Sequence, residues 1–345
     1  MSVIFPNAFV AAGGEPRFGG LSIAVLIPCY NEATAIDKVV RDFAKALPQA
    51  DIYVYDNNST DGTAEVATAA GAIVRREPRQ GKGHVVRRMF ADVEADIYLM
   101  VDGDDTYDAS AAPEMVARMV DEGLDLVNGV RIAGTQTAYR PGHKLGNRVL
   151  SGLVQSIFGR GTTDMLSGYR VFSRRFVKTF PMMSRGFEIE TELTVHSLEL
   201  DMPTGEVPGA FKDRAEGSES KLNSIRDGVR ILSTITKLLK QERPLAVFAG
   251  LAVVFAALSV TLAWPLLTEY LATGLVPRLP TAVLSASIMI LSFLMGAVGL
   301  ILDTVTRGRQ ETKRMRYLSV PGVLSAAAPH AHAPDGAMVR ASGSA

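Results

Sequence analysis

The stretch YLMVDGDDTYDAS, from Tyr98 to Ser110, runs from a short apolar segment into a cluster of acids. These acids are Asp102, Asp104, Asp105 and Asp108. Like charges this close repel one another, so a partner of opposite charge would stabilise the cluster. Asp102 and Asp104 flank Gly103, and two carboxylates at i and i+2 on a turn can both face a divalent cation. Mg²⁺ and Mn²⁺ prefer such oxygen ligands and share their shell with phosphates, although a solvated acidic turn has the same pattern.

Short apolar runs alternate with helical stretches from Leu21 onward. Strands are predicted at LSIAVLIP, DIYVYD, AIVRRE and DIYLMVD, and helices at ATAIDKVVRDFAKAL, GTAEVATAAG and GKGHVVRRMFADVEA. This alternation predicts an α/β domain with a mostly parallel sheet over residues 21–218. Ligands of such sheets bind outside the carboxyl ends of the strands. Polar clusters follow three of these ends, namely CYNE, DNNSTDGT and DGDDTYD, so we expect a ligand site at this edge.

The composition excludes some classes of protein. The 36 basic and 36 acidic side chains cancel, so no overall field favours a nucleic-acid partner. Cys29 is the only cysteine of the chain, which excludes an intramolecular disulfide and fits a reducing compartment. Residues 1–20 form an N-terminal tail without the pattern of a signal peptide. We therefore expect the domain that follows to lie in the cytoplasm.

Two long runs without charged residues follow Arg243. They predict transmembrane helices at residues 244–267 and 280–302, because each meets the roughly 20 residues that cross a bilayer. Basic residues flank both outer ends: Lys237, Lys240 and Arg243 before, and Arg307, Arg309, Lys313, Arg314 and Arg316 after. This places both ends, including a basic segment at 303–318, on the cytoplasmic side of a multi-pass protein of the inner membrane. The alternative is a pair of buried helices in a soluble domain.

The segments beside these spans have distinct patterns. Residues 219–243 predict an amphipathic helix with an apolar stripe and basic residues largely off it. Such a helix beside a membrane span favours docking in the headgroup layer, and packing on the predicted sheet is the alternative. Residues 319–345 are low in complexity and predict a disordered tail, with His330 and His332 exposed to water.

The ordered set of motifs resembles the GT-A fold of the family 2 glycosyltransferases. The motifs are IPCYNEATAI, YDNNSTDGT, GKGHVVRRM, VDGDD, DMLSGYRVFSRR, GFEIETEL and EVPGAFKDRAEGSESKL. The resemblance covers about residues 21–240 and is closest to the polyprenyl- or dolichyl-phosphate glycosyltransferases. It implies a Rossmann-like GT-A catalytic domain followed here by a two-helix transmembrane hairpin.

The resemblance also implies a donor site. The expected donor-binding residues are Pro28, Tyr30, Asn31, Glu32, Asp56, Ser59, Asp61, Gly81, Lys82, Asp102 and Asp104. Asp56 would contact the nucleobase, whereas Asp61 could equally serve only as a helix cap. Asp102 and Asp104 would hold Mg²⁺ or Mn²⁺ against the diphosphate. Thr106 stands where the dolichyl enzymes often have Gln, which puts direct ligation by that residue in doubt.

For the acceptor, the resemblance implies basic residues. The candidates are Arg131, Lys144, Arg148, Arg170, Arg214 and Lys221, each with a surface ion pair as the alternative. Asp104, Glu192, Arg131 and Arg214 form the expected catalytic set, although Glu192 could serve only to orient or to pack. A phosphate acceptor needs no general base, because its second pKa of about 6 leaves it anionic at neutral pH.

Together these features predict an inverting glycosyltransferase at the cytoplasmic membrane face. It would move one sugar from a nucleotide sugar, UDP- in preference to GDP-linked, to a polyprenyl phosphate. Its partners would be these substrates and membrane lipids, with a homo-oligomer left open. The alternatives are an enzyme that glycosylates a lipid hydroxyl and a catalytically inactive membrane scaffold. A processive synthase is disfavoured, because Trp264 is the only tryptophan and lies in the first span, outside any Q-x-x-R-W motif.

Overall fold

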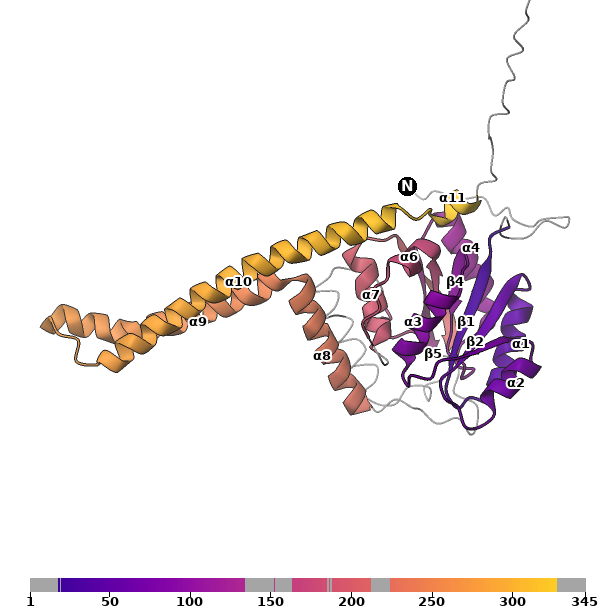
Figure 1. Cartoon of the computed structure of the whole chain (residues 1–345), viewed down its shortest axis with the longest axis horizontal. Helices are drawn as coiled ribbons and strands as arrows, with labels where there is room; N and C mark the ends of the chain where they lie inside the picture. Colours follow the sequence, from indigo (N-terminus) through magenta and orange to yellow (C-terminus); the bar gives the residue numbers. More distant parts are fainter. Residues whose placement is uncertain are drawn as a thin grey trace, which may run out of the picture.

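The computed structural model describes residues 18, 20–133, 152, 163–184, 186, 188–211 and 224–327. Figure 1 shows a globular α/β domain from which a long helical hairpin extends. The strands are β1 (Ile23–Cys29), β2 (Ala50–Asp56), β3 (Ile73–Arg76), β4 (Ile97–Met100), β5 (Leu126–Ala133), β6 (Arg170–Ser173) and β7 (Thr204–Phe211). They form one sheet in the order β3-β2-β1-β4-β6-β5-β7, in which β6 runs antiparallel to its neighbours. The predicted fold class, a mostly parallel α/β sheet, is confirmed.

Helices cover both faces of this sheet. Those of the domain are α1 (Ile36–Ala46), α2 (Thr63–Ala69), α3 (Lys82–Asp92), the short 3₁₀ helix η1 (Ala109–Ala111), α4 (Ala112–Glu122), α6 (Arg174–Thr179) and α7 (Ile189–Glu199). Those that follow are α8 (Ser224–Glu242), α9 (Pro244–Thr273), α10 (Leu279–Leu318) and α11 (Val323–Ala327). Each of the predicted strands and helices quoted above coincides with one of these elements.

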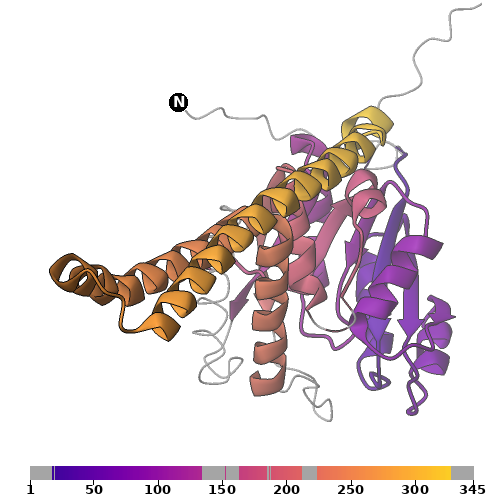
Figure 2. The same ribbon diagram turned by 60° about the vertical axis from the view of Figure 1, so that its left-hand side comes forward.

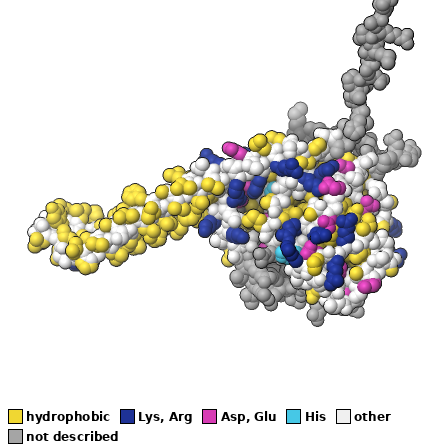
Figure 3. All heavy atoms as spheres, in the orientation of Figure 1, with side chains coloured by type: hydrophobic (Ala, Val, Ile, Leu, Met, Phe, Trp, Pro, Cys, Tyr) yellow, Lys and Arg dark blue, Asp and Glu magenta, His cyan; other side chains and the backbone are white. Residues whose placement is uncertain are grey.

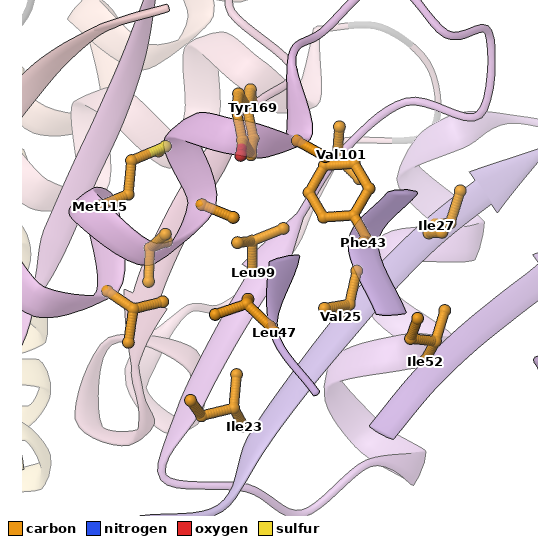
Figure 4. Packing of buried hydrophobic residues seen from close by; sticks show 14 of the residues in the cluster. Ile23, Val25, Ile27, Phe43, Leu47, Ile52, Leu99, Val101, Met115 and Tyr169 are labelled. Carbon is orange, nitrogen blue, oxygen red and sulfur yellow. The ribbon is translucent and has the colours of Figure 1, made fainter. Parts of the chain in front are cut away.

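Alternate side chains of the central strands enter two separate cores. Val25 and Ile27 of β1 pack with Phe43 and Met115 on the α1 and α4 side, as Figure 4 shows. Leu26, from the same strand, points to the opposite core with α3, α6 and α7. Neighbouring residues of a strand face opposite sides, so a strand covered on both faces is apolar throughout. This explains the unbroken apolar runs in the sequence.

The strand order places the candidate site. β1 lies between β2 and β4, and both pairings are parallel. The loops that leave β1 toward α1 and β4 toward η1 therefore open at the same edge of the sheet. β2 ends beside β1, with Asp56 paired to Cys29. The connection after β1 leads to β2 on one side, whereas the connection after β4 leads to β5 on the other side, and a crevice at such a switch point is where ligands of open α/β sheets bind.

The hairpin exposes apolar surface along most of its length (Figure 3). α9 and the helical stretch Leu279–Ser325 both have the length and apolar composition of a membrane span, with mean hydropathies of 2.5 and 2.2. Only 6% and 17% of these apolar windows are buried within the molecule. A buried core helix of a soluble protein would be covered by its own chain, so the exposure favours a lipid-facing hairpin over that alternative. The predicted spans at 244–267 and 280–302 lie inside α9 and α10.

Helix α10 continues well past its apolar part and packs on the α/β domain. Its last turns lie beside α6 and α7 in both views (Figures 1 and 2). The hydroxyl of Tyr317 donates a hydrogen bond of 2.6 Å to Asp125, and the guanidinium of Arg175 lies 4.6 Å from the centre of the Tyr317 ring. The basic segment expected at 303–318 is therefore the C-terminal half of a single helix.

The chain remains ordered after α10. Val323 of α11 is buried in the α1 and α4 core, and Leu324 approaches Gly123 at the end of α4. The expectation of a disordered tail from residue 319 is thus wrong for its first part, because an apolar pair in an otherwise low-complexity segment finds a core site. His330 and His332 lie outside the described residues.

Helix α8 packs on the α/β domain through its C-terminal half. Ile235 and Leu238 are buried against Val195 of α7 and Met165. Leu232 of the predicted apolar stripe is half exposed. The C-terminal half of the helix therefore has the alternative arrangement that the sequence left open, packing on the domain. The side chains of residues 222–231 lie outside the described residues, so docking of that part in the headgroup layer stays a prediction.

Candidate functional site

The loops after β1 and β2 are held together by hydrogen bonds between backbone and side chains. Asn31 adopts a left-handed backbone conformation (φ 54°), and its side-chain oxygen accepts from the amide of Thr60 at 2.8 Å. Its own amide donates to the hydroxyl of Ser59 at 2.9 Å. Asp61 accepts from the amides of Ala33 and Thr63, so it joins the two loops as well as capping α2. These contacts fix the shape of the edge.

Asn57 links the second loop to the start of α3. Its amide group donates to the carbonyl oxygens of Glu77 and Arg79, both at 2.8 Å, and its oxygen accepts from the amide of Gly81 at 2.8 Å. Gly81 has φ 130°, a conformation open to glycine but not to residues with a Cβ. The N-terminus of α3 is thereby aimed at the edge where the acidic stretch begins.

Lys82, the first residue of α3, lies between two carboxylates. Its Nζ donates to Asp102 Oδ1 and to Glu190 Oε1, each at 2.6 Å. The side chains of Lys82 and Glu190 are 9% and 7% exposed, whereas that of Asp102 is 30% exposed. Burial alone would lower the pKa of Lys82, but the two carboxylates outweigh it and raise this pKa, so the ammonium stays charged. The cluster joins α3, the end of β4 and the first turn of α7.

The rest of the acidic stretch is tightly packed. A Cβ at Gly103 would lie 2.6 Å from the sulfur of Cys29, so only glycine lets the turn between Asp102 and Asp104 approach β1 this closely. Asp104 is buried and accepts from the hydroxyl of Thr106 at 2.6 Å. Asp105 instead points outward and pairs with Lys38 at 2.7 Å. Thus Asp102 is the acid of the D-x-D pair that is open to solvent.

The segment before β6 covers the other side of Asp102. A Cβ at Gly168 would lie 2.3 Å from Asp102 Oδ2, so glycine is needed for this approach. The amide of Gly168 donates to the Tyr107 hydroxyl at 2.9 Å, and burial raises the pKa of Tyr107 to about 12. Nearby, Arg131 of β5 forms two parallel hydrogen bonds of 2.7 Å to Asp164. One wall of the site is therefore fixed by a buried ion pair.

Comparison with known proteins agrees with this geometry. The family model described as glycosyl transferase family 2 matches residues 24–180. Glycosyltransferase AglJ of Haloferax volcanii is 36% identical over 248 residues, which are 70% of this chain and 80% of that protein. The chain belongs to glycosyl transferase family 2.

Two further glycosyltransferases are less similar in sequence. A dolichyl-phosphate hexose transferase of Haloferax volcanii is 28% identical over 222 residues, 64% of this chain and 95% of that protein. A crystal structure of glucosyl-3-phosphoglycerate synthase from Mycobacterium tuberculosis, in complex with Mn²⁺, UDP-glucose and phosphoglyceric acid, superposes with a TM-score of 0.52. The two chains share 23% identity over 64% of this chain and 80% of that one, which is a likeness of fold.

The donor residues expected for this family 2 enzyme gather at one edge. Asn31, Asp56, Ser59, Asp61, Gly81, Lys82, Asp102 and Asp104 lie on the interlinked loops described above, as do Pro28, Tyr30 and Glu32 at the end of β1. Asp56 is buried at the end of β2 and accepts from the amide of Ser59. Their roles toward a ligand stay predictions.

Of the residues predicted to bind the acceptor, Arg131 and Arg170 lie among the described residues. Arg170 is fully buried, and it donates to Thr194 and to the carbonyl oxygens of Ser167 and Met165. Burial lowers its pKa to about 10, and an interior guanidinium with these partners stabilises the fold, which does not favour contact with an acceptor phosphate. Arg131 is partly exposed and paired with Asp164. Lys144, Arg148, Arg214 and Lys221 lie outside the described residues.

Glu192 does not reach the donor edge. Its two oxygens accept from the amides of Met183 and Ser184, each at 2.7 Å, so it fixes the loop before α7. Its neighbour Glu190 is the residue that meets Lys82, and sequence reasoning missed it. Residues two apart on a helix point to nearly opposite sides, and GFEIETEL alone gives no reason to prefer one. Asn57, Asp164 and Gly168 were missed too, although each lies in a motif quoted for the resemblance.

The site can be tested for its fit to a divalent cation. Among the described residues, no group of three or more His, Cys, Asp or Glu is placed to hold one. Asp102 and Asp104 supply oxygen ligands of the kind that Mg²⁺ and Mn²⁺ prefer, and such ions in phosphate-binding sites commonly take only one or two carboxylates. The ammonium of Lys82 already pairs with Asp102, the more exposed of the two acids. The two carboxylates therefore fit a metal ion whose other ligands come from a bound diphosphate.

Proposed function

We propose that this glycosyltransferase moves a single sugar from a nucleotide sugar to a polyprenyl phosphate at the cytoplasmic face of a membrane. One observation carries the proposal: a D-x-D edge and an exposed apolar hairpin belong to the same folded unit, joined by α8 and α10. A soluble acceptor would need no hairpin, whereas a lipid phosphate remains at the bilayer surface.

The relatives support each half of this proposal. The fold neighbour is described in complex with Mn²⁺ and UDP-glucose, which favours a UDP-sugar donor and a divalent cation. The name of the 28% identical relative, dolichyl-phosphate hexose transferase, favours a polyprenyl phosphate acceptor. The basic residues outside the spans favour a catalytic domain on the cytoplasmic side.

The donor diphosphate would bind beside Lys82 and the D-x-D pair. Asp102 and Asp104 would hold the cation, which when bound supplies Lewis-acid stabilisation of the departing diphosphate. Glu190 would keep the ammonium of Lys82 in place while the ammonium turns from Asp102 to a phosphate oxygen. The charge of Lys82 would then balance Asp102 before the donor binds and the diphosphate afterwards. The interlinked loops hold these groups before substrate arrives, which lowers the reorganisation that the reaction requires.

The acceptor phosphate would attack without a protein base. Its oxygen is already anionic near neutral pH, because the second pKa of a phosphate monoester is about 6. Direct attack on the sugar carbon opposite the departing diphosphate inverts its configuration. Arg131 is our proposed positive charge on the acceptor side, and Asp164 orients its guanidinium.

The proposal is tested with the full chain in membranes. Labelled UDP- and GDP-sugars are supplied with Mn²⁺ or Mg²⁺ and a defined polyprenyl phosphate, and an acid-labile lipid-linked sugar is the expected product. Asp102→Ala should abolish it, and Asp121→Ala, an exposed acid on α4, should not. A base- and acid-stable glycolipid would instead favour a lipid hydroxyl acceptor, and no product with any donor would favour an inactive scaffold.

A further inference from the structure

A pocket lies where the catalytic domain meets the membrane hairpin. It has a volume of about 260 Å³ and lies between α7, the end of α8, α10 and the loop after α6. Its lining includes His196, Glu199, Glu242, Arg309 and Lys313. This space far exceeds the ~10–15 Å³ that one water needs, but falls just below the ~300 Å³ at which pockets for drug-sized ligands begin. It suits a small polar group.

Two buried acceptors in its wall lack hydrogen-bond partners among the described residues. They are Nδ1 of His196, a residue that is 3% exposed, and Oε2 of Glu242. With the hydroxyl of Thr179 donating to the carbonyl of Arg175 at 2.7 Å, the 3.2 Å contact between this hydroxyl and Nε2 of His196 favours the tautomer with its proton on Nε2. Nδ1 is then a bare acceptor. Unpaired buried acceptors are costly, and a donor from the pocket would satisfy both.

The wall also carries an excess of negative charge. Its acids are Glu192, Glu199 and Glu242, and its cations are Arg309 and Lys313. Lys313 pairs with Glu199 at 2.6 Å and approaches Glu242 to 3.8 Å, while Arg309 pairs with Glu242 at 2.9 Å. Burial, with the charge of Lys313 nearby, lowers the pKa of His196 to about 3, so the imidazole adds no positive charge. Burial and the charge of Glu242 raise the pKa of Glu199 despite Lys313, so these two neighbouring carboxylates share too little positive charge. The unbalanced charge favours a cation in the pocket.

The position of the pocket indicates where that cation comes from. Glu242 ends α8, and α9 begins only two residues later at Pro244. Thr306 of α10 donates to the carbonyl of Gln241, which fixes the same level on the second helix. This is the point where the chain leaves the domain and enters the apolar hairpin, so the pocket lies at the depth of lipid headgroups. Phe180, Met183 and Leu238 supply an apolar wall beside the charged groups.

We propose that this pocket binds the primary ammonium headgroup of a membrane phospholipid, such as phosphoethanolamine. The ammonium would donate to Oε2 of Glu242 and Nδ1 of His196, and its charge would balance the third carboxylate. The exposed side of Arg309, 43% accessible, would face the lipid phosphate. A quaternary ammonium has the charge but no N–H to donate, and an anionic headgroup has neither.

Such a ligand would be sensed at the sugar-transfer site through α7. Glu192 lines the pocket and holds the loop at Met183, while Glu190, two residues earlier, holds Lys82 at the donor edge. The two sites thus share one rigid helix. The binding itself is measured without any sugar donor, so the test below is independent of the proposed function.

The proposal is tested with the delipidated full chain in nanodiscs that contain equal amounts of phosphatidylethanolamine, phosphatidylcholine and phosphatidylglycerol with identical acyl chains. Lipids retained after transfer to detergent are counted by native mass spectrometry. We expect phosphatidylethanolamine to be enriched about tenfold, the effect of one hydrogen bond to a charged group. Equal retention, or enrichment of phosphatidylglycerol through Arg309 and Lys313, overturns the proposal.

Two variants locate the binding. Glu242→Gln removes the excess charge but keeps an oxygen for Arg309, and His196→Phe removes Nδ1 but keeps a ring between Phe176 and Phe180. Both should abolish the enrichment, and Glu122→Gln, which removes an exposed acid paired with Arg118, should leave it intact. Retention unchanged in both pocket variants contradicts the proposal.

A soluble probe covers the case in which the variants fail to fold. Phosphoethanolamine should raise the thermal unfolding temperature of the unaltered full chain, and phosphocholine at the same concentration should not. Equal effects of the two would show that the N–H groups are not recognised, and no effect from either would show that the pocket does not bind this headgroup; both results overturn the proposal.

Discussion

Two lysines of this protein each lie between two carboxylates, and both clusters use a glutamate of α7. Lys82 binds Asp102 and Glu190 at the donor edge. Lys313 binds Glu199 and approaches Glu242 at the junction with the hairpin. The charges are similar, but the accessibility is not: Asp102 is 30% exposed, whereas Glu199 and Glu242 are 5% and 6% exposed. A carboxylate that is open to solvent can exchange its lysine for a ligand, whereas an ion pair with buried carboxylates holds elements together.

This contrast predicts a large loss of stability at the junction. Lys313→Met should lower the free energy of unfolding by about 3–5 kcal/mol, because it leaves buried carboxylates without their cation. The measurement is a urea titration of the full chain in detergent, followed by circular dichroism. Arg41→Met, at an exposed ion pair with Asp37, should change little. Equal effects of the two variants would show that the buried cluster has no special role.

The matching change at the donor edge should act on turnover instead. Lys82→Met is expected to lower kcat by about 10²–10³, the usual effect of removing one preorganised charge from a reacting oxyanion. Glycosyl transfer is measured at saturating donor, with thermal unfolding as the check on folding. A loss confined to KM would indicate that Lys82 binds the donor without stabilising the departing diphosphate.

The change of stability with pH tests the burial of His196 at the junction. His196 titrates near 6.5 when unfolded and has a pKa of about 3 when folded, so the unfolded chain binds more protons between these values and stability falls as the pH is lowered. From pH 6.5 to 5 the loss from this group should reach about 2 kcal/mol. His196→Phe should remove that part of the slope. An unchanged slope in the variant would mean that folding does not lower the pKa of His196.

The smallest expected effect concerns the end of α10. Tyr317→Phe removes the hydrogen bond to Asp125 and should cost about 1 kcal/mol of stability, measured by the same urea titration. Asp125 keeps Ser173 and Arg175 as partners, which is why the loss is modest. A loss as large as that of Lys313→Met would show that the last turn of α10 is the main attachment.

The donor edge was predictable because its signals are local. Apolar runs fixed the strands, and each polar cluster followed its strand directly in the sequence. The choice between Glu190 and Glu192 was not predictable, since it depends on the rotation of α7 against the sheet. Arg131 and Asp164 are separated by 33 residues, and no periodic pattern in the sequence relates the two positions. Arg170 has the same charge as a surface arginine, and only packing reveals that it is buried.

The contacts at the junction could not be predicted from the sequence for a further reason. Lys313 is 114 residues from Glu199, and Tyr317 is 192 residues from Asp125. The basic segment after the second span has a sufficient explanation in membrane topology, so nothing in the pattern indicated that its side chains meet acids of the catalytic domain. Interactions between distant segments depend on the completed fold.

The unbroken course of α10 restricts how the chain length can vary. Forty residues of helix extend about 60 Å, roughly twice the apolar thickness of a bilayer. Each residue inserted between the span and Lys313 would rotate everything beyond it by about 100°. One insertion would therefore turn Tyr317 away from Asp125, whereas about seven, close to two full turns, would restore the phase but raise the catalytic domain by about 10 Å.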